Sequence, residues 1–272
     1  LGPGNAGQIF IQADTMALVN GGQILSDTRG SGRAGDLGIS AKELLLQDGG
    51  RISSDSYDAG DAGDVTIAVD KVVVDAGDDV SFISSDSLGE GAAGTVAVIS
   101  KSILVDNGGF ISSDTYTSGQ GGNLVISADT IDLRNFGQIR SQTRLVGDAG
   151  SVSIEAKTIT LDSGGAILSE AIGRNVEGRA GAVEIVADTL NIGARSIVST
   201  STAGTGDGGA VFIEAGTISL EDGGAVASGT EPGSAGNAGS VDLIVDTLTV
   251  GEGSSITTST GGSGDAGVVT VE

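Results

Sequence analysis

The chain has 272 residues, of which 48 are glycine, 38% are hydrophobic and only 3% are aromatic, so any packed interior must be built from Val, Ile, Leu and Ala. Its 13 basic and 36 acidic residues give a formal charge of −23, which repels phosphate backbones and anionic lipid surfaces and excludes nucleic acid as a partner. The lack of cysteine and histidine removes disulfides, thiolate and imidazole catalysis, and the usual zinc, copper and haem ligands.

A small dipeptide, Ala-Gly or Gly-Gly, recurs along the whole chain. Its second glycine is found at Gly7, Gly35, Gly63, Gly94, Gly122, Gly150, Gly181, Gly209, Gly239 and Gly267. The spacing between neighbours is 28 to 31 residues, and self-similarity at such a period indicates a repeat architecture. The chain starts inside a repeat, without a signal peptide or a long apolar run, so we expect residues 1–272 to be a single repeat segment of a longer chain that does not insert into a membrane.

Each repeat predicts three short strands in order. The first follows the glycine with alternating apolar residues, as in Val65, Ile67 and Val69, and the second follows a corner, as in Leu44 and Leu46. A glycine-rich turn then leads to a third strand, which reads QILSDT, RISSDS, FISSDS, FISSDT, QIRSQT, AILSEA, SIVSTS, AVASGT and SITTST in successive repeats. We expect the glycines of turns such as DAGD and GSGDAG to turn corners with a positive φ.

Short strands at a period just under 30 residues, without helical periodicity, leave few architectures. A β-propeller blade needs about 40 residues, and a leucine-rich repeat has its own asparagine signature. The pattern predicts an all-β, right-handed parallel β-helix, with three strands and 28–31 residues per coil and roughly nine to ten coils stacked about 4.8 Å apart. The extra residues of the longer repeats, near 76–80 and 170–179, are predicted to lie in loops.

One corner position alternates in charge from coil to coil. It reads Asp14, Lys42, Asp70, Lys101, Asp129, Lys157 and Asp188, followed by Gly216 and Asp246. Stacking places neighbours about 4.8 Å apart, and a slip of one coil would put like charges together. The pattern predicts an electrostatic ladder that favours correct registration of the coils, against the alternative of a corner that merely requires a polar residue.

The third strand carries the sharpest candidates for a site. Its serines, such as Ser54 and Ser85, share the parity of the core isoleucines and should point inward. Its aspartates have the opposite parity and should point outward on an open face: Asp27, Asp55, Asp86 and Asp114. We interpret this column as a solvated face, with weak calcium binding as the second alternative and glycosidase chemistry by paired carboxylates as the third.

Apolar residues also point outward in the N-terminal half of the chain. Leu45, Val73 and Leu104 share one outward position, and Phe82 and Phe110 share another. They predict either a patch that docks a partner or an accidental patch without function.

The repeat resembles a known family. Units such as GDAGDVTIAVDKVVVDAGDDVSFISSDS and GDAGSVSIEAKTITLDSGGAILSE are similar to the repeat tracts of filamentous-haemagglutinin-like exoproteins. The resemblance covers nearly the whole chain. It implies a right-handed parallel β-helix exported by two-partner secretion through an outer-membrane transporter, at the surface of or secreted from a Gram-negative-type bacterium, with roles in adhesion or contact between cells. It transfers no functional residue, because the family's secretion and toxic domains have no counterpart here.

These observations favour a non-catalytic structural and interaction shaft of an adhesin-like protein, without a cofactor unless the aspartate column binds calcium. The sequence does not identify the host, cell-surface or matrix receptor. A carbohydrate-binding or carbohydrate-cleaving β-helix is one alternative, and an extracellular fibre that assembles end to end is another, since a coil stack has strand edges at its ends.

Overall fold

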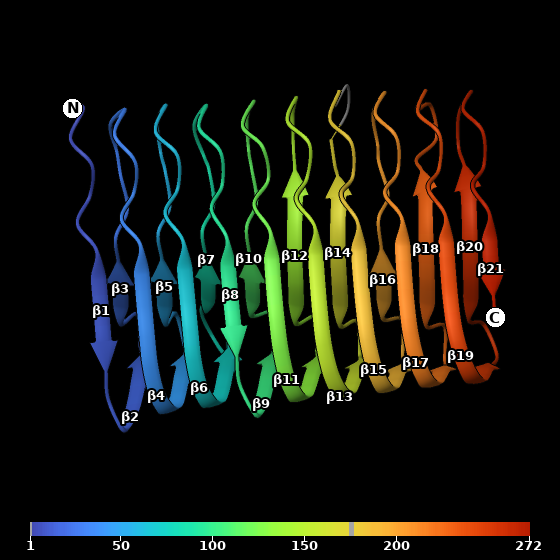
Figure 1. The fold of residues 1–272 in the computed structure, drawn as a ribbon, viewed down its shortest axis with the longest axis horizontal. Helices are drawn as coiled ribbons and strands as arrows, with labels where there is room; N and C mark the ends of the chain where they lie inside the picture. Colours follow the sequence, from blue (N-terminus) through green and yellow to red (C-terminus); the bar gives the residue numbers. More distant parts are fainter. Residues whose placement is uncertain (1, 174–176) are drawn as a thin grey trace.

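The computed structural model describes residues 2–173 and 177–272 as a parallel β-solenoid. The described residues contain no helix, and their strands stack in about nine coils (Figure 1), which confirms the predicted fold class. Two parallel sheets run along the rod, one of twelve strands and one of nine. No helix among these residues is therefore long and apolar enough to cross a membrane.

Every coil contributes strands to both sheets. The twelve-stranded sheet contains β1 (Ile9–Gln12), β2 (Thr15–Val19), β4 (Leu37–Gln47), β6 (Val65–Asp75), β8 (Val96–Ile99), β9 (Ser102–Asp106), β11 (Leu124–Arg134), β13 (Val152–Asp162), β15 (Val183–Ile192), β17 (Val211–Leu220), β19 (Val241–Val250) and β21 (Val269–Val271). The nine-stranded sheet contains β3 (Gln23–Leu25), β5 (Arg51–Ser53), β7 (Phe82–Ser84), β10 (Phe110–Ser112), β12 (Gln138–Thr143), β14 (Ala166–Ala171), β16 (Ile197–Ser199), β18 (Ala225–Thr230) and β20 (Ser255–Thr260).

The first and second predicted strands of a repeat join into one long strand in most coils. β4, β6, β11 and β13 each span 11 residues, whereas the two segments remain separate as β1 with β2 and as β8 with β9. Pairing skips one residue at the junction, as between Ala128 and Thr130 of β11, so the charged corner residue lies outside the ladder of paired residues. Equivalent repeat positions pair throughout, for example Leu37 with Val65 and Val65 with Val96.

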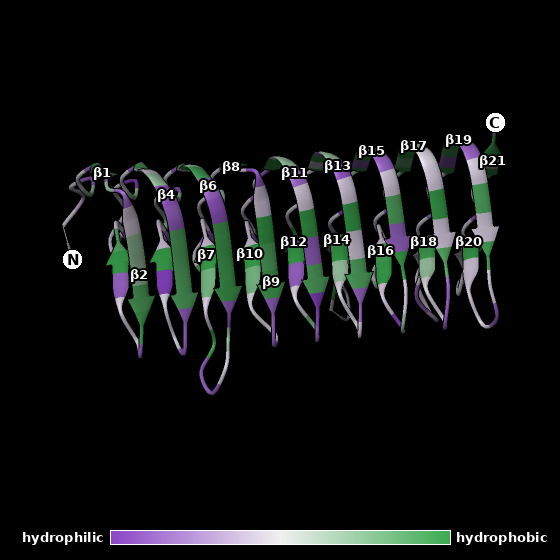
Figure 2. Cartoon of the chain, turned by 90° about the horizontal axis from the view of Figure 1, so that it is seen from below, coloured by the Kyte–Doolittle hydropathy of each residue, from purple (hydrophilic) through white to green (hydrophobic). Residues whose placement is uncertain are grey.

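The core is a set of parallel columns of aliphatic side chains. Within one coil Val65, Ile67, Val72, Val74 and Ile83 are all fully buried. The alternation of hydrophobic and hydrophilic residues along the strands repeats from coil to coil (Figure 2). Each such side chain contributes roughly 1.5–3 kcal/mol when it leaves water, so the columns are the main stabilising element.

Close backbone approach, and not a positive φ, explains the repeating glycines. A Cβ at Gly35 would lie 1.9 Å from the carbonyl oxygen of Gly7 and 2.5 Å from the Ser26 hydroxyl. The predicted inward serines are buried and donate to these glycine carbonyls, as Ser54 does to Gly35 at 2.6 Å. The expectation of a positive φ was therefore wrong for Gly35 and its equivalents, although it holds in the turn before the third strand, where Gly49 has a φ of 85°.

The extra residues of the two longer repeats were predicted to lie in loops. Residues 76–80 lie in the turn between β6 and β7, outside any strand, as expected. In the segment 170–179, Glu170 and Ala171 belong to β14, which corrects the predicted start of this loop, and residues 172–173 and 177–179 lie outside any strand. Residues 174–176 lie outside the described part of the chain.

Candidate functional site

The predicted charge ladder consists of three ion pairs. Lys42 binds Asp14 at 2.8 Å, Lys101 binds Asp70 at 2.9 Å, and Lys157 binds Asp129 at 2.7 Å, each lysine reaching the aspartate of the preceding coil. The pair with Asp129 raises the pKa of the Lys157 ammonium. Asp188, the last member of the ladder, forms no ion pair among the described residues.

The aspartate column is buried, which corrects the expectation of an open face. Asp55, Asp86 and Asp114 are 5%, 7% and 0% exposed, and only Asp27 is half-buried. Tyr57 and Tyr116, in the loops that follow, lie near these side chains. Burial, reinforced by the charges of Asp55 and Asp27 for Tyr57 and of Asp86 and Asp114 for Tyr116, raises the pKa of both phenols. Arg29 stacks on Tyr57 and Arg144 on Tyr116, with guanidinium carbons 5.4 and 4.7 Å from the ring centroids.

The aspartates act as hydrogen-bond acceptors between coils. Asp86 accepts the backbone N–H of Asp114 at 2.8 Å and the hydroxyl of Ser112 at 2.9 Å. Asp55 accepts the N–H of Asp86 at 2.8 Å and the hydroxyl of Ser84 at 2.9 Å. Asp27 bonds the next coil in the same way. Each carboxylate thus binds a backbone N–H just beyond the end of a short strand, where no ladder bond is made.

Arg140 terminates this column. Its Nε donates to Asp114 at 2.9 Å, and both side chains are shielded, with 15% and 0% of their surface exposed. Gln142 continues the column in the next coil, because its backbone N–H donates to Asp114 at 2.9 Å and its side-chain amide donates to Glu170 at 3.1 Å. Arg140 and, by its charge, Arg144 therefore act on a row of carboxyl groups.

Burial shifts the acidity of the column. It raises the pKa of Asp55 to about 7, with the charge of Asp27 adding to the effect. Burial, followed by the charges of Asp114 and Asp55, raises the pKa of Asp86 well above its ordinary value. Burial also raises the pKa of Asp114, although Arg140 opposes it. The column consequently carries protons at pH values where exposed aspartates are ionised.

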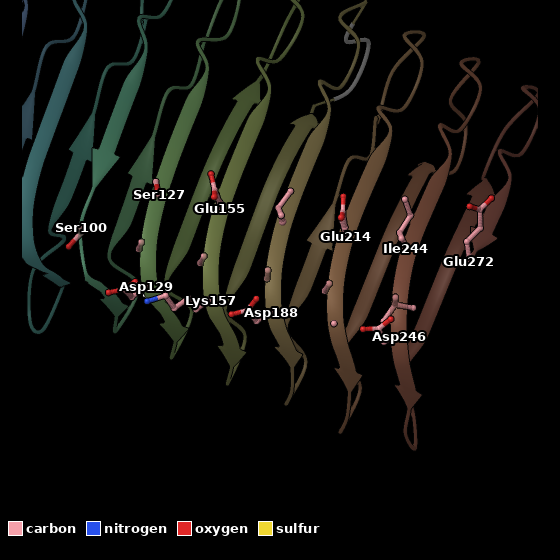
Figure 3. A pocket seen from close by; sticks show the side chains of 17 residues that line it. Ser100, Ser127, Asp129, Glu155, Lys157, Asp188, Glu214, Ile244, Asp246 and Glu272 are labelled. Carbon is pink, nitrogen blue, oxygen red and sulfur yellow. Dashed lines mark ion pairs between the residues drawn. The ribbon is translucent and has the colours of Figure 1, made fainter.

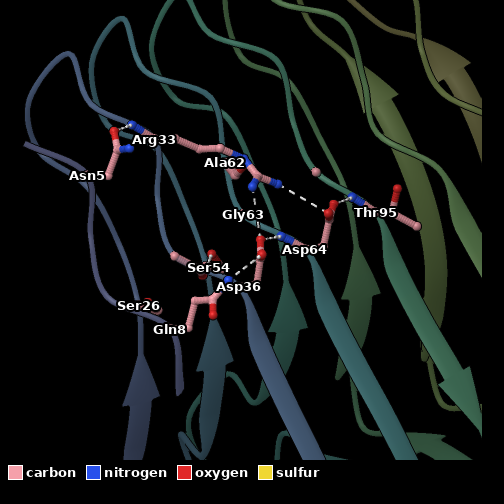
Figure 4. A network of polar contacts seen from close by, with 12 residues as sticks. Asn5, Gln8, Ser26, Arg33, Asp36, Ser54, Ala62, Gly63, Asp64 and Thr95 are labelled. Carbon is pink, nitrogen blue, oxygen red and sulfur yellow. Dashed lines mark hydrogen bonds and ion pairs between the residues drawn. The ribbon is translucent and has the colours of Figure 1, made fainter. Parts of the chain in front are cut away.

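Acidic and amide side chains perform a similar task in the corners before the first strand. Asp36 accepts the N–H of Asp64 at 3.1 Å, and Asp64 accepts the N–H of Thr95 at 2.9 Å (Figure 4). Arg33 contacts Asp36 and Asp64 at 3.1 Å each, and its own N–H donates to Asn5 at 2.9 Å. Much of the acidic composition therefore serves the stacking of coils.

Calcium binding by Asp27, Asp55, Asp86 and Asp114 stays a prediction. Among the described residues no group of three or more acidic side chains is arranged to hold a metal ion. One carboxyl per coil, already engaged by an N–H and a hydroxyl, explains this arrangement.

The predicted apolar patch is divided between the two sheets. Phe82 and Phe110 stack on the nine-stranded sheet, with centroids 5.0 Å apart and planes 2° from parallel. Arg51 lies 5.3 Å from the Phe82 centroid and Arg140 lies 4.2 Å from that of Phe110, so the outer ring faces are covered. Leu45, Val73 and Leu104 form a half-buried column in the twelve-stranded sheet. A partner surface at these residues stays a prediction.

A groove that the sequence reading missed runs along the twelve-stranded sheet from β11 to β19. It encloses about 890 Å³. Two rows of side chains border it (Figure 3): one contains Glu155, Glu214 and Ile244, and the other contains the paired Asp129 and Lys157, followed by Asp188 and Asp246. Between the rows lies a column of small residues, Ala128, Ala156, Ala187, Ala215 and Val245.

A signal for this groove was present in the ladder column. Where the alternation of charge predicts another lysine, the chain has Gly216, and Asp188 and Asp246 lie one coil to either side.

Among known proteins, no family model, no curated protein and no solved structure matches this chain.

Proposed function

We propose that this chain is a stiff, non-catalytic shaft of a secreted or cell-surface bacterial protein, which holds adhesive or effector parts away from the cell. The main support for this proposal is that equivalent positions pair in register from Ile9 of β1 to Val271 of β21 around one continuous aliphatic core. Each coil binds its neighbours through parallel backbone hydrogen bonds, and a rod of this kind resists bending with little demand on individual residues.

The filamentous-haemagglutinin-like character of the repeat belongs to this proposal. The solenoid fold and the glycine register agree with the resemblance of units such as residues 60–87 to that family's repeat tracts. In this proposal the chain leaves the cell through an outer-membrane transporter and folds outside, and the absence of cysteine suits a chain that crosses the envelope unfolded.

A carbohydrate-cleaving role has less support from the residues proposed to carry it. A sugar cleft needs open aromatic platforms beside an acid and a base. The outer ring faces of the Phe82 and Phe110 stack are covered by Arg51 and Arg140, and Asp55 and Asp86 are occupied by backbone N–H groups.

Duplication of one coil tests the shaft directly. A variant in which residues 181–208 are repeated should remain folded and lengthen by about 4.8 Å, as measured by small-angle X-ray scattering. Collapse of the fold or an unchanged length would contradict a rod with interchangeable coils. A length that grows with protein concentration would instead support the self-assembling fibre.

A second measurement separates the shaft from the enzyme. The wild type and the triple variant Asp55→Asn, Asp86→Asn and Asp114→Asn should release the same amount of reducing ends from a panel of polysaccharides. Cleavage by the wild type that disappears in this folded variant would overturn the non-catalytic proposal.

A further inference from the structure

The groove contains carboxylates that make no direct contact with a partner. Glu155, Asp188, Glu214 and Asp246 form no hydrogen bond or ion pair through their side chains within the described residues. Asp188 acts on Lys157 only through its charge, which contributes to the raised pKa of that ammonium. The absence of direct contacts distinguishes the four carboxylates from the aspartates of the buried column and from those paired with lysines.

Gly216 leaves a vacancy between two of these carboxylates. At the equivalent corner three other coils carry lysines, each of which binds the aspartate of the preceding coil at 2.7–2.9 Å. Asp188 is the preceding aspartate for position 216, and Asp246 follows. A Cβ built at Gly216 would lie 3.0 Å from the backbone oxygen of Asp188 and 4.0 Å from Oδ2 of Asp246, so the Asp246 carboxylate is the nearest side chain to the missing one. The same chain thus shows which chemical group fits here: a primary ammonium.

The row of the groove that contains Glu155, Glu214 and Ile244 favours an elongated ligand over a single amine. Glu155, Val186, Glu214 and Ile244 follow one another from coil to coil, and the two aliphatic side chains are 38% and 43% exposed. Carboxylate and aliphatic groups therefore alternate with a repeat of two coils, about 9.6 Å. A peptide in the polyproline II conformation advances about 9.3 Å in three residues, so every third side chain would meet a carboxylate.

The charge of the chain selects among elongated partners. A second copy, with its own charge of −23, is repelled, and an acidic segment or a phosphate polymer is repelled for the same reason. We propose that the groove across β13, β15, β17 and β19 docks an extended, lysine-bearing segment of a partner protein, with one lysine ammonium between Asp188 and Asp246 above Gly216. The aliphatic parts of the segment rest against Val186 and Ile244.

Fluorescence anisotropy with a defined peptide tests this docking. The probe is a fluorescein-labelled peptide of four Lys-Pro-Pro repeats, and the same peptide with acetylated lysines is its control. The lysine peptide should bind the wild type with an affinity that falls as salt rises, and the acetylated peptide should not bind. Equal binding of both peptides would overturn the role of the ammonium groups.

Substitutions at Gly216 locate the site. Gly216→Lys supplies the missing ladder cation from within the chain and should weaken peptide binding by about tenfold or more, whereas Gly216→Ala should bind as the wild type does. Three coils already carry lysine at this corner, but a Cβ at position 216 would lie 3.0 Å from the Asp188 backbone oxygen, so both variants require a small local adjustment. Thermal melting by circular dichroism checks that each variant is folded. Unchanged binding by Gly216→Lys would overturn the placement.

A matched pair of triple variants separates the groove from general attraction. Asp188→Asn, Glu214→Gln and Asp246→Asn should lower the affinity by about tenfold or more, whereas Asp58→Asn, Asp78→Asn and Glu90→Gln remove the same charge from distant exposed positions and should change it by less than about twofold. Equal losses in both would show that net charge alone attracts the peptide. Spermine that binds as tightly as the peptide would contradict a protein partner.

Discussion

The outer face of the nine-stranded sheet is built in two ways along one rod. In coils that span residues 35–121 it carries Asp55, Asp86 and Asp114 in a buried row, flanked by Tyr57 and Tyr116. In coils that span residues 181–266 the same column reads Ser201, Gly229 and Ser259 and borders a shallow pocket of about 310 Å³.

The core beneath both halves is the same. Ile83 and Ile111 in the N-terminal half and Val198 and Val226 in the C-terminal half are fully buried in one inward column. The aliphatic columns therefore suffice to stack coils, and the outer columns are free to diverge. The carboxyl row adds coil-to-coil side-chain hydrogen bonds at the cost of buried charge, and the column of Ser201, Gly229 and Ser259 has neither.

Removal of Arg140 should have the largest effect on the N-terminal half. Arg140→Met leaves Asp114 buried without its cation and should lower the free energy of unfolding by about 3 kcal/mol at pH 8. The loss should shrink at pH 5, where Asp114 is protonated more readily, because burial raises its pKa. Urea unfolding at both pH values measures this difference.

The matched control is Arg134→Met. Arg134 binds Asp106 at 2.8 Å, but its side chain is 44% exposed, so a loss of about 1 kcal/mol or less is expected. Similar losses of unfolding free energy in the two variants would show that burial of the ion pair does not determine its contribution to stability.

At Asp86, in the middle of the carboxyl row, the stability of the fold should depend on the presence of an acceptor oxygen and not on its charge. Asp86→Ala leaves the N–H of Asp114 without its partner and should cost about 1–3 kcal/mol, whereas Asp86→Asn keeps an acceptor oxygen and should cost less, most clearly at pH 8. Ser201→Ala, at the equivalent position in the C-terminal half, should change stability by less than about 0.5 kcal/mol. An Asn variant as unstable as the Ala variant would contradict the acceptor role.

The two halves should also respond differently to pH. The raised pKa values of Asp55, Asp86 and Asp114 mean that the folded state holds protons that the unfolded chain releases, so their contribution to stability is present below about pH 4 and declines as the pH rises toward and through 7. Each titrating carboxyl changes stability by on the order of 1 kcal/mol per pH unit in this window.

Hydrogen exchange resolved by coil would test the pH response. Amides of residues 35–121 should lose protection between pH 5 and 8, after correction for intrinsic exchange, relative to those of residues 181–266. The groups that face the row are Asp27, Tyr57, Tyr116, Arg140 and Arg144, of which the arginines keep their charge throughout. Asp55→Asn should reduce the difference, and equal loss of protection in both halves would contradict the assignment.

The repeat permitted accurate prediction of everything that depends on identical positions stacking. The Asp129 and Lys157 pair was predicted because neighbouring coils place the same position side by side, and the inward Ser54 followed from strand parity. The expectation that Asp86 lies on an open face was wrong, because strand parity gives only the direction in which a side chain points. Whether that direction leads to solvent depends on loops such as the one that carries Tyr116.

By itself the sequence determined that this chain winds into a parallel coil stack, because glycine spacing and alternating aliphatic residues specify backbone contact and core at each turn. Only the tertiary structure decided which acidic residues are sealed inside and which are left unpartnered. Burial is a property of the surroundings: Asp86 is buried near Tyr57 and Tyr116 of the loops that follow its strand positions, whereas Asp188 and Asp246 border a groove beside Gly216.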